Sequence, residues 1–282
     1  MLYLLLAILS SAAIAVVMRL SSNKVTSGNT MLATNYLVCL VLAAMFGDFQ
    51  LLPLGETGFG KTVIFGAING FMYLMGFVLL QYSTRKNGVV LSSVFMKLGL
   101  LVPIVLSLVV FGEVPNVVQA VGFFLAIGAI ILINYEKGVK HGTSDGKGKW
   151  ILVLLLLAGG GGDAMSKVFS MYGPQQLEET FLFYTFLSAL VLCLVLVIRN
   201  KERLQPAALL FGVLVAVPNF FSARFLLKAV GVMPAVVVYP TFSVTTILVV
   251  TLVGVLAFRE RLRKNQWIAL AVILAAVALL NI

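Results

Sequence analysis

The stretch that decides the fold class is "WILVLLLLAGGGGDAMSKVF", residues 150–169, an apolar run that carries four consecutive glycines, an acid and a lysine. A phosphate-binding loop needs a preceding strand and the spacing G-x-x-x-x-G-K-[ST], and this stretch has neither. Its length instead matches the roughly 20 residues with which a helix crosses a bilayer. Small residues let neighbouring helices approach closely. We therefore predict a packing and hinge segment at Gly159, Gly160, Gly161 and Gly162.

The composition of the whole chain points to a membrane protein. Of its 282 residues, 61% are hydrophobic and 11% are charged, against about 45–50% and about 25% in soluble domains. The net charge of +10 comes from short loops between apolar runs, so it predicts no nucleic-acid-binding face. Cys39 and Cys193 lie in apolar runs and the single histidine, His141, lies in a loop. We expect no metal, no cofactor and no enzyme activity.

Ten apolar segments predict an all-α integral membrane protein with ten transmembrane helices. The first has no basic residue before its apolar core, so we expect a span and not a cleaved signal peptide. A polar stretch at 138–148 predicts a cytoplasmic linker between two five-helix repeats, 1–137 and 149–282. The predicted spans are Leu2–Leu20, Met31–Gly47, Thr62–Leu80, Val89–Phe111, Asn116–Asn134, Lys149–Ser170, Thr180–Ile198, Ala207–Leu227, Val232–Ala257 and Gln266–Asn281.

The loop charges predict the orientation in the membrane. With ten spans, alternate loops face opposite sides, and one side receives 15 of the 20 Lys and Arg residues. Cytoplasmic loops are the ones enriched in Lys and Arg. We therefore predict cytoplasmic basic loops and both termini outside the cell membrane.

A repeat appears when the chain is compared with itself at an offset of 147 residues. Phe111, Glu113 and Gln119 then align without a gap with Phe258, Glu260 and Gln266. The same offset pairs Asn134 with Asn281, and an offset of 148 pairs Arg19 with Lys167. Because five spans per half is an odd number, the second copy must cross the membrane in the opposite sense, as in inverted-repeat transporters.

Ten spans in a 5+5 arrangement, with Phe-x-Glu and a Gln six residues after the Glu before the last helix of each half, resemble the drug/metabolite transporter superfamily. The EamA-like ten-helix branch is the most similar. The resemblance implies export or exchange of small metabolites, and a cavity lined by the third, fourth, eighth and ninth helices with help from the first and sixth. The chain departs from the pattern in two places: Arg259 replaces the Gly before Glu260, and members are commonly drawn with both termini inside.

Charged residues inside predicted spans are functional candidates, because each costs about 2.5–3.5 kcal/mol at a bilayer centre. Lys97, Asp163, Lys167 and Arg224 are such residues, with a net charge of +2 that favours an anionic or amphoteric solute. Asp163 and Lys167 are predicted to serve in coupling or charge relay. Their i, i+4 spacing also allows them simply to neutralise one another, and Lys167 snorkelling outward would leave Asp163 to Arg224.

Polar and aromatic residues cluster in the helices that the resemblance makes cavity-lining. Together with Lys97 and Arg224, we predict substrate contacts from Asn69, Tyr73, Asn219, Tyr239 and Ser243. Prolines inside spans free backbone carbonyls, and the ones predicted to act as hinges or in packing are Pro103, Pro218 and Pro240. Helix packing is the alternative for each of these residues.

The leading hypothesis is a secondary active transporter, an exporter or exchanger, of a small polar, anionic or amphoteric metabolite by alternating access. The rival is a proton-coupled exporter of lipophilic cations that uses Asp163 as counter-ion. Expected partners are the substrate, the lipid bilayer and protons or a counter-substrate, with no nucleic acid, and the chain is expected to be a monomer. An intramembrane enzyme would need clustered acids or a nucleophile, and a scaffold would not need charges in several helices.

Overall fold

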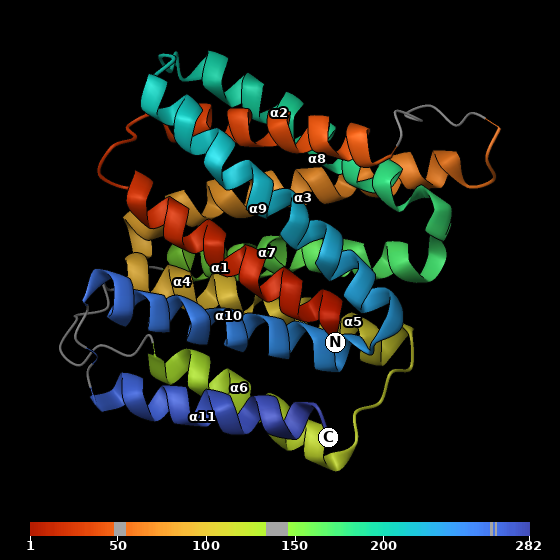
Figure 1. The fold of residues 1–282 in the computed structure, drawn as a ribbon, viewed down its shortest axis with the longest axis vertical. Coiled ribbons are helices and arrows are strands. Elements are labelled where there is room, and N and C mark those ends of the chain that lie inside the picture. Colours follow the sequence, from red (N-terminus) through yellow and green to blue (C-terminus); the bar gives the residue numbers. More distant parts are fainter. Residues whose placement is uncertain (48–54, 134–145, 260–261, 263) are drawn as a thin grey trace. The chain divides into compact units, whose positions relative to one another are not determined.

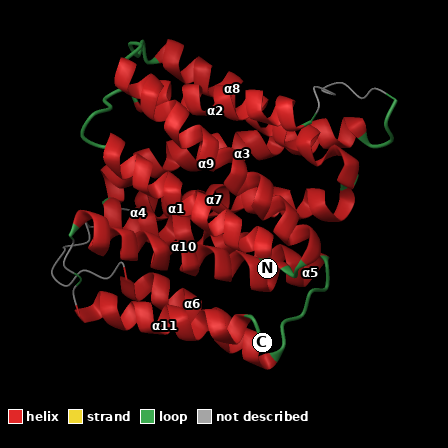
Figure 2. Cartoon of the chain, viewed as in Figure 1, coloured by secondary structure: helices red, strands yellow, loops and turns green. Residues whose placement is uncertain are grey.

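The computed structural model of the protein describes residues 1–47, 55–133, 146–259, 262 and 264–282. Within these ranges every regular element is a helix, and no strand occurs (Figure 2). Eight helical segments are long and apolar enough to cross a membrane, and two further apolar helices have 17 residues each. The prediction of an all-helical multi-pass membrane protein is thereby confirmed.

Each predicted span coincides with helical residues, and the chain order can be followed by colour in Figure 1. The elements are α1 Leu2–Ser21, α2 Gly28–Phe46, α3 Phe59–Asn87, α4 Val89–Lys97, η1 Leu98–Leu100, α5 Leu101–Val110, α6 Val117–Ile133, α7 Gly146–Tyr172, η2 Gln175–Leu177, α8 Glu178–Arg199, α9 Pro206–Val232, α10 Ala235–Phe258 and α11 Lys264–Leu280.

The segment Val89–Phe111 differs from its prediction because it is not one continuous α-helix. It is divided into α4, the 3₁₀ turn η1 and α5. Pro103 has no N–H to donate to the carbonyl of Gly99, so the regular α-helical bonding is interrupted at this turn. A 3₁₀ turn inside a helical stretch is one way in which the chain accommodates such a break.

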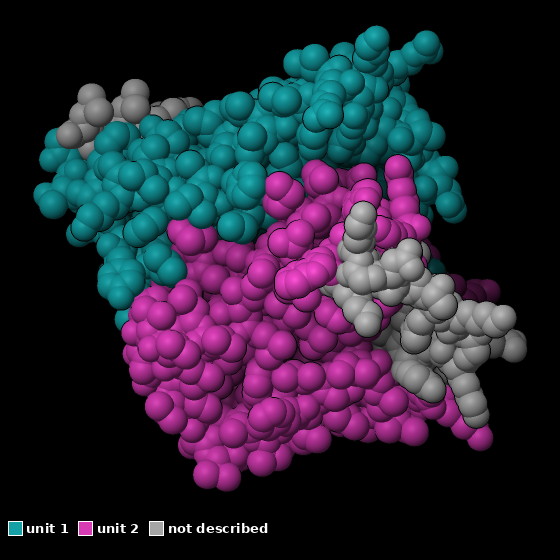
Figure 3. Space-filling view, turned by 180° about the vertical axis from the view of Figure 1, so that it is seen from behind, with its two compact units in different colours: residues 1–74, 168–231 teal, residues 75–167, 232–282 magenta. Residues whose placement is uncertain are grey.

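The helices form two compact units, which Figure 3 shows in different colours. Unit 1 contains residues 1–74 and 168–231, and unit 2 contains residues 75–167 and 232–282. Each unit therefore takes helices from both halves of the sequence. The long helices α3 and α7 contribute residues to both units.

Unit 1 is organised around the packing of α2 along α8. Glycines allow the remaining helices to come close: a Cβ on Gly212 in α9 would lie 2.7 Å from the carbonyl oxygen of Met31 in α2. Gly70 in α3 lies against Thr185 and Ala189 of α8 in the same way. In lipid the hydrophobic effect does not drive helices together, so the close van der Waals packing that small residues permit stabilises these contacts.

Unit 2 is organised around the pair α6 and α11, which lie side by side (Figure 1). A Cβ on Gly122 in α6 would lie 3.0 Å from the carbonyl oxygen of Ala276 in α11. Helix α10 packs against α11, α6 and α5. This arrangement places the broken helix α4–η1–α5, the part of α7 up to Lys167 and the start of α10 in one unit, where most of the charged candidates lie.

Candidate functional site

The predicted site residues are divided between the two units. Unit 1 contains Asn69, Tyr73, Arg224, Asn219 and Pro218. Unit 2 contains Lys97, Pro103, Glu113, Gln119, the glycines 159–162, Asp163, Lys167, Tyr239, Pro240, Ser243 and Gln266. Glu260 lies outside the described residues. We therefore treat the two groups separately, beginning with unit 2.

The glycine run of α7 crosses η1 at very close range. A Cβ on Gly160 would overlap the carbonyl oxygen of Gly99, and a Cβ on Gly99 would lie 2.7 Å from the backbone nitrogen of Gly160. One residue earlier, a Cβ on Gly159 would lie 2.7 Å from the sulfur of Met96. Only residues without side chains permit this crossing. The packing role thus has a defined location, and the hinge role stays a prediction.

Two opposite charges lie close to this crossing along the chain. Lys97 ends α4 two residues before Gly99, and Asp163 follows Gly160 by three residues in α7. Both side chains are partly buried. Among the described residues, neither the Lys97 ammonium nor the Asp163 carboxylate has a hydrogen bond or an ion pair with another side chain. An uncompensated charge inside a span is a candidate contact for a solute or an ion.

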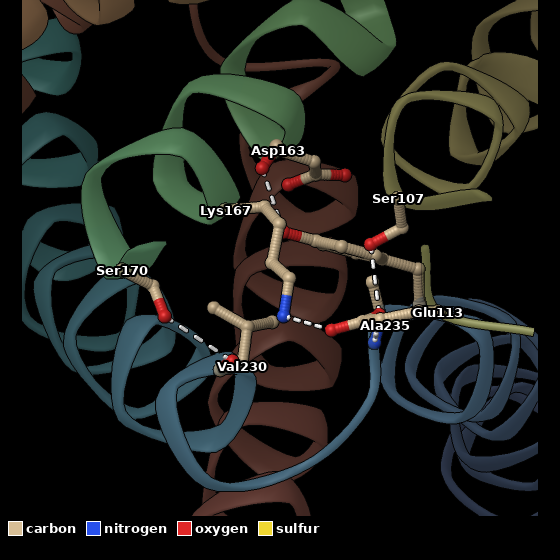
Figure 4. Close-up of polar contacts among 8 residues, drawn as sticks. Ser107, Glu113, Asp163, Lys167, Ser170, Val230 and Ala235 are labelled. Atoms are coloured by element: carbon tan, nitrogen blue, oxygen red, sulfur yellow. Dashed lines mark hydrogen bonds and ion pairs between the residues drawn. The ribbon is translucent and has the colours of Figure 1, made fainter. Parts of the chain in front are cut away.

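Lys167 does not neutralise Asp163, which corrects one reading of their i, i+4 spacing. Its ammonium binds the Glu113 carboxylate at 2.6 Å, and the side chain is nearly fully buried. Figure 4 shows Lys167 extending toward Glu113, away from the Asp163 carboxylate. Asp163 precedes Lys167 by four residues in α7, so the two residues lie on the same face of that helix. The lysine nevertheless takes its partner from the segment between α5 and α6.

Glu113 is held by three helices of unit 2. Its Oε2 accepts 2.8 Å hydrogen bonds from the hydroxyl of Ser107 in α5 and from the backbone N–H of Ala235, the first residue of α10. Its Oε1 binds Lys167 of α7. Burial raises the pKa of the Glu113 carboxyl, but the hydrogen bonds from Lys167, Ser107 and Ala235 outweigh it, so the pKa lies below its ordinary value. A carboxylate at a helix N-terminus is also stabilised by the helix dipole.

Tyr239 forms a second link between α7 and α10. Its hydroxyl donates a 2.6 Å hydrogen bond to the backbone carbonyl of Asp163, and the residue is fully buried. The bond engages the main-chain carbonyl of Asp163 and not its carboxylate. Pro240 follows directly inside α10, and Ser243 lies one turn further on, partly buried.

In unit 1 the predicted polar residues mainly connect helices to one another. Asn69 of α3 is buried and donates to the hydroxyl of Thr185 in α8 at 3.2 Å, while its Oδ1 has no partner among the described residues. Tyr73 lies one turn further along α3. Asn219 of α9 donates to Oδ1 of Asn35 in α2 at 3.2 Å, directly after Pro218. Hydrogen bonds of this kind hold transmembrane helices together.

Arg224 is bound within unit 1 by an acid and an aromatic ring. Its Nε lies 2.5 Å from Oε1 of Glu179 in α8, and its guanidinium lies over the ring of Phe46, 4.5 Å from the centroid. Glu179 is not among the predicted site residues, because the predicted span begins one residue later, at Thr180. The signal in the sequence is the pair Glu178-Glu179, since acids are favoured in the first turn of a helix.

The repeat signature has a structural explanation in its first copy. Gln119 and Asn116 form reciprocal bonds at the start of α6: the N–H of Gln119 donates to Asn116 Oδ1 at 2.7 Å, and the N–H of Asn116 donates to Gln119 Oε1 at 3.2 Å. This is a capping box. In the second copy, Gln266 lies in the first turn of α11. Ser107 and Ala235, which complete the Glu113 site, carry no sequence pattern that marks them in advance.

Comparisons with known proteins agree with this architecture. A family model described as the EamA-like transporter family matches residues 1–135 and again residues 148–282. The chain is 24% identical over 285 residues to an uncharacterized protein of Haemophilus influenzae, with 97% of this chain and 95% of the relative covered. A solved crystal structure is similar in fold, with a TM-score of 0.74 at 14% identity, and covers 99% of this chain and 94% of that one.

The match of the family model extends over nearly the whole sequence. It confirms the resemblance drawn from the Phe-x-Glu turns and the apolar segments, and with it a membrane transporter. The chain belongs to the EamA-like transporter family.

Proposed function

We propose that this protein is a secondary active transporter that moves a small amphoteric or anionic metabolite across the cell membrane by alternating access. The observation that carries the proposal is the pair of charges without a side-chain partner among the described residues, Lys97 and Asp163, within a few residues of the Gly99–Gly160 crossing in unit 2. Buried charges are costly, so a pair without protein partners fits a ligand that supplies them. Lys97 would bind an anionic group and Asp163 a cationic group or a proton.

The other two intramembrane cations alter the balance predicted from sequence. Lys167 is bound by Glu113 and Arg224 by Glu179. Of the four charged residues predicted inside spans, all of them in the described part of the chain, Lys97 and Asp163 are left for a solute, one positive and one negative in place of a surplus of +2. This balance supports an amphoteric solute more strongly than a simple anion.

The proposal includes the topology that the repeat and the loop charges favour. Ten helices form two inverted five-helix repeats, the basic loops are cytoplasmic and both termini lie outside. The protein works as a monomer. It draws its energy from a proton or counter-substrate gradient, because the sequence contains no phosphate-binding loop for ATP. A thiol-labelling scan of single cysteines in the loops of intact cells tests the orientation.

Counterflow in proteoliposomes tests the function. Vesicles are preloaded with a mixture of standard amino acids, with dicarboxylates or with tetraphenylphosphonium, and uptake of the same labelled probe is measured. We expect counterflow with the amino acid mixture, abolished in Lys97→Gln and in Asp163→Asn. The matched controls are Lys86→Gln and Glu56→Gln, since both residues are exposed. Wild-type counterflow in both site variants would refute the binding roles.

The lipophilic-cation alternative rests on the unpaired Asp163 alone. It predicts counterflow of tetraphenylphosphonium that is lost in Asp163→Asn but retained in Lys97→Gln, because a positively charged lysine does not bind a cation. An amphoteric solute requires both residues. The same set of variants therefore separates the two functions.

A further inference from the structure

The Glu113 carboxylate binds Lys167, which is the basic residue of α7 nearest to Asp163 along the chain. Lys167 follows Asp163 by four residues, the spacing at which an acid and a base on a helix attract one another. In the low dielectric of a membrane span this attraction is stronger than in water. The observed partner of Lys167 is nevertheless Glu113, at 2.6 Å.

We propose that Glu113 is a positioning residue that withdraws Lys167 from Asp163 and so keeps the Asp163 carboxylate unpaired. The role of the Asp163 carboxylate in transport rests on the proposed function. The pairing of Lys167 with Glu113 rests on the geometry of unit 2 alone. Without Glu113, the buried ammonium of Lys167 would have the neighbouring Asp163 as an acid partner on its own helix. The acid would then be neutralised.

The surroundings of Glu113 suit this role. Ser107 and the N–H of Ala235 both bind Oε2, which fixes the carboxylate and leaves Oε1 directed at Lys167. Tyr239 holds the main chain of Asp163 from α10, one turn from Ala235. The two links attach α7 to α10 at positions one turn apart on each helix. These links hold the stretch of α7 that carries Asp163 and Lys167 against the start of α10.

The test uses a readout that does not depend on knowing the substrate. Dicyclohexylcarbodiimide adds to a protonated, unpaired intramembrane carboxyl, and the adduct on the Asp163 peptide is measured by mass spectrometry. We expect Glu113→Gln to lower labelling of Asp163 by about tenfold, in the range of typical coupling between sites. Glutamine keeps one acceptor oxygen for Ser107 and Ala235 but has no charge to hold Lys167.

Rescue separates this role from simple stabilisation. The double variant Glu113→Gln/Lys167→Gln has lost the same ion pair as Glu113→Gln. Labelling of Asp163 should nevertheless return to the wild-type extent, because the competing lysine is gone. Lys167→Gln alone should label as wild type, and Asp163→Asn not at all.

Two results would overturn the inference: unchanged labelling in Glu113→Gln, or a double variant that labels no better than Glu113→Gln. If Glu113→Gln does not fold, Glu113→Asp serves instead, since it keeps the charge but withdraws it by one methylene from Lys167. Failure of the proposed function gives a different pattern, in which Asp163→Asn transports as wild type while the labelling of all variants follows the expectation. The two failures are therefore distinguishable.

Discussion

The hydroxyl of Tyr239 in α10 binds the main-chain carbonyl of Asp163 in α7 at 2.6 Å, inside the core of unit 2. One turn earlier in α10, Ala235 binds Glu113, which in turn binds Lys167, one turn later in α7. The two helices therefore run antiparallel where they meet and are joined at two levels. These links fix the part of α7 that carries the acid, directly after its glycine crossing.

Replacing Tyr239 with Phe should weaken this attachment without creating a cavity. The loss of one buried hydrogen bond should lower the free energy of unfolding by about 0.5–1.5 kcal/mol, measured by denaturation in detergent micelles. Tyr82→Phe is the control, because Tyr82 lies in α3 of the same unit and is 54% exposed. Equal stability of Tyr239→Phe and the wild type would show that the hydrogen bond contributes nothing.

A methyl group at Gly160 should separate α7 from η1. Because the added carbon would overlap the carbonyl oxygen of Gly99, Gly160→Ala should destabilise the protein by about 1–3 kcal/mol, as overpacking does elsewhere. Gly128→Ala in α6 is the matched control, since a Cβ there meets nothing within 4 Å. That substitution should be neutral or stabilising by up to about 1 kcal/mol. The same response from both variants would contradict the close crossing.

The positions of the helices could be predicted from sequence because the bilayer sets their length. A span needs about 20 apolar residues, and every predicted segment, from Leu2–Leu20 to Gln266–Asn281, coincides with helical residues. The division of Val89–Phe111 could not be predicted in the same way. Pro103 indicated a freed carbonyl, but the 3₁₀ turn also depends on how closely Gly99 approaches Gly160, which is a tertiary contact.

The candidate site was only partly predictable for a related reason. The charges inside spans stand out in a sequence because they are costly in lipid, so Lys97, Asp163 and Lys167 could be named as candidates from the sequence. Their pairing depends on contacts between segments distant in the chain. The i, i+4 rule concerns one helix, whereas the partner of Lys167 is Glu113, 54 residues away along the chain (167 − 113).

The ion pair of Arg224 and Glu179 should stabilise unit 1. Arg224→Gln leaves Glu179 without its cation, and its second oxygen is already without a partner among the described residues; the expected cost is about 1–3 kcal/mol. Arg224→Lys should recover only part of it, because a lysine cannot combine the Glu179 contact with stacking on Phe46. A double-mutant cycle with Glu179→Gln measures the coupling by unfolding in micelles.

The same cycle tests whether Arg224 binds the solute. If its role is the ion pair, Arg224→Gln and Glu179→Gln should reduce counterflow to a similar extent, in step with their stability. If Arg224 contacts the solute, as its position in the sequence predicted, Arg224→Gln should abolish counterflow while Glu179→Gln retains it. Additive effects on stability would contradict the ion pair itself.

Acid should remove the contribution of Glu113. Its pKa in the folded protein lies below the ordinary value, so the carboxylate stabilises the fold fully above the unfolded pKa of about 4.3. That contribution is lost as the pH falls through the folded pKa, because the unfolded chain, in which the carboxyl has the higher pKa, binds the proton more tightly than the native protein does. The difference in unfolding free energy between the wild type and Glu113→Gln should therefore stay constant from neutral pH to about pH 5 and shrink below it. A difference that widens toward acid would contradict the lowered pKa of Glu113.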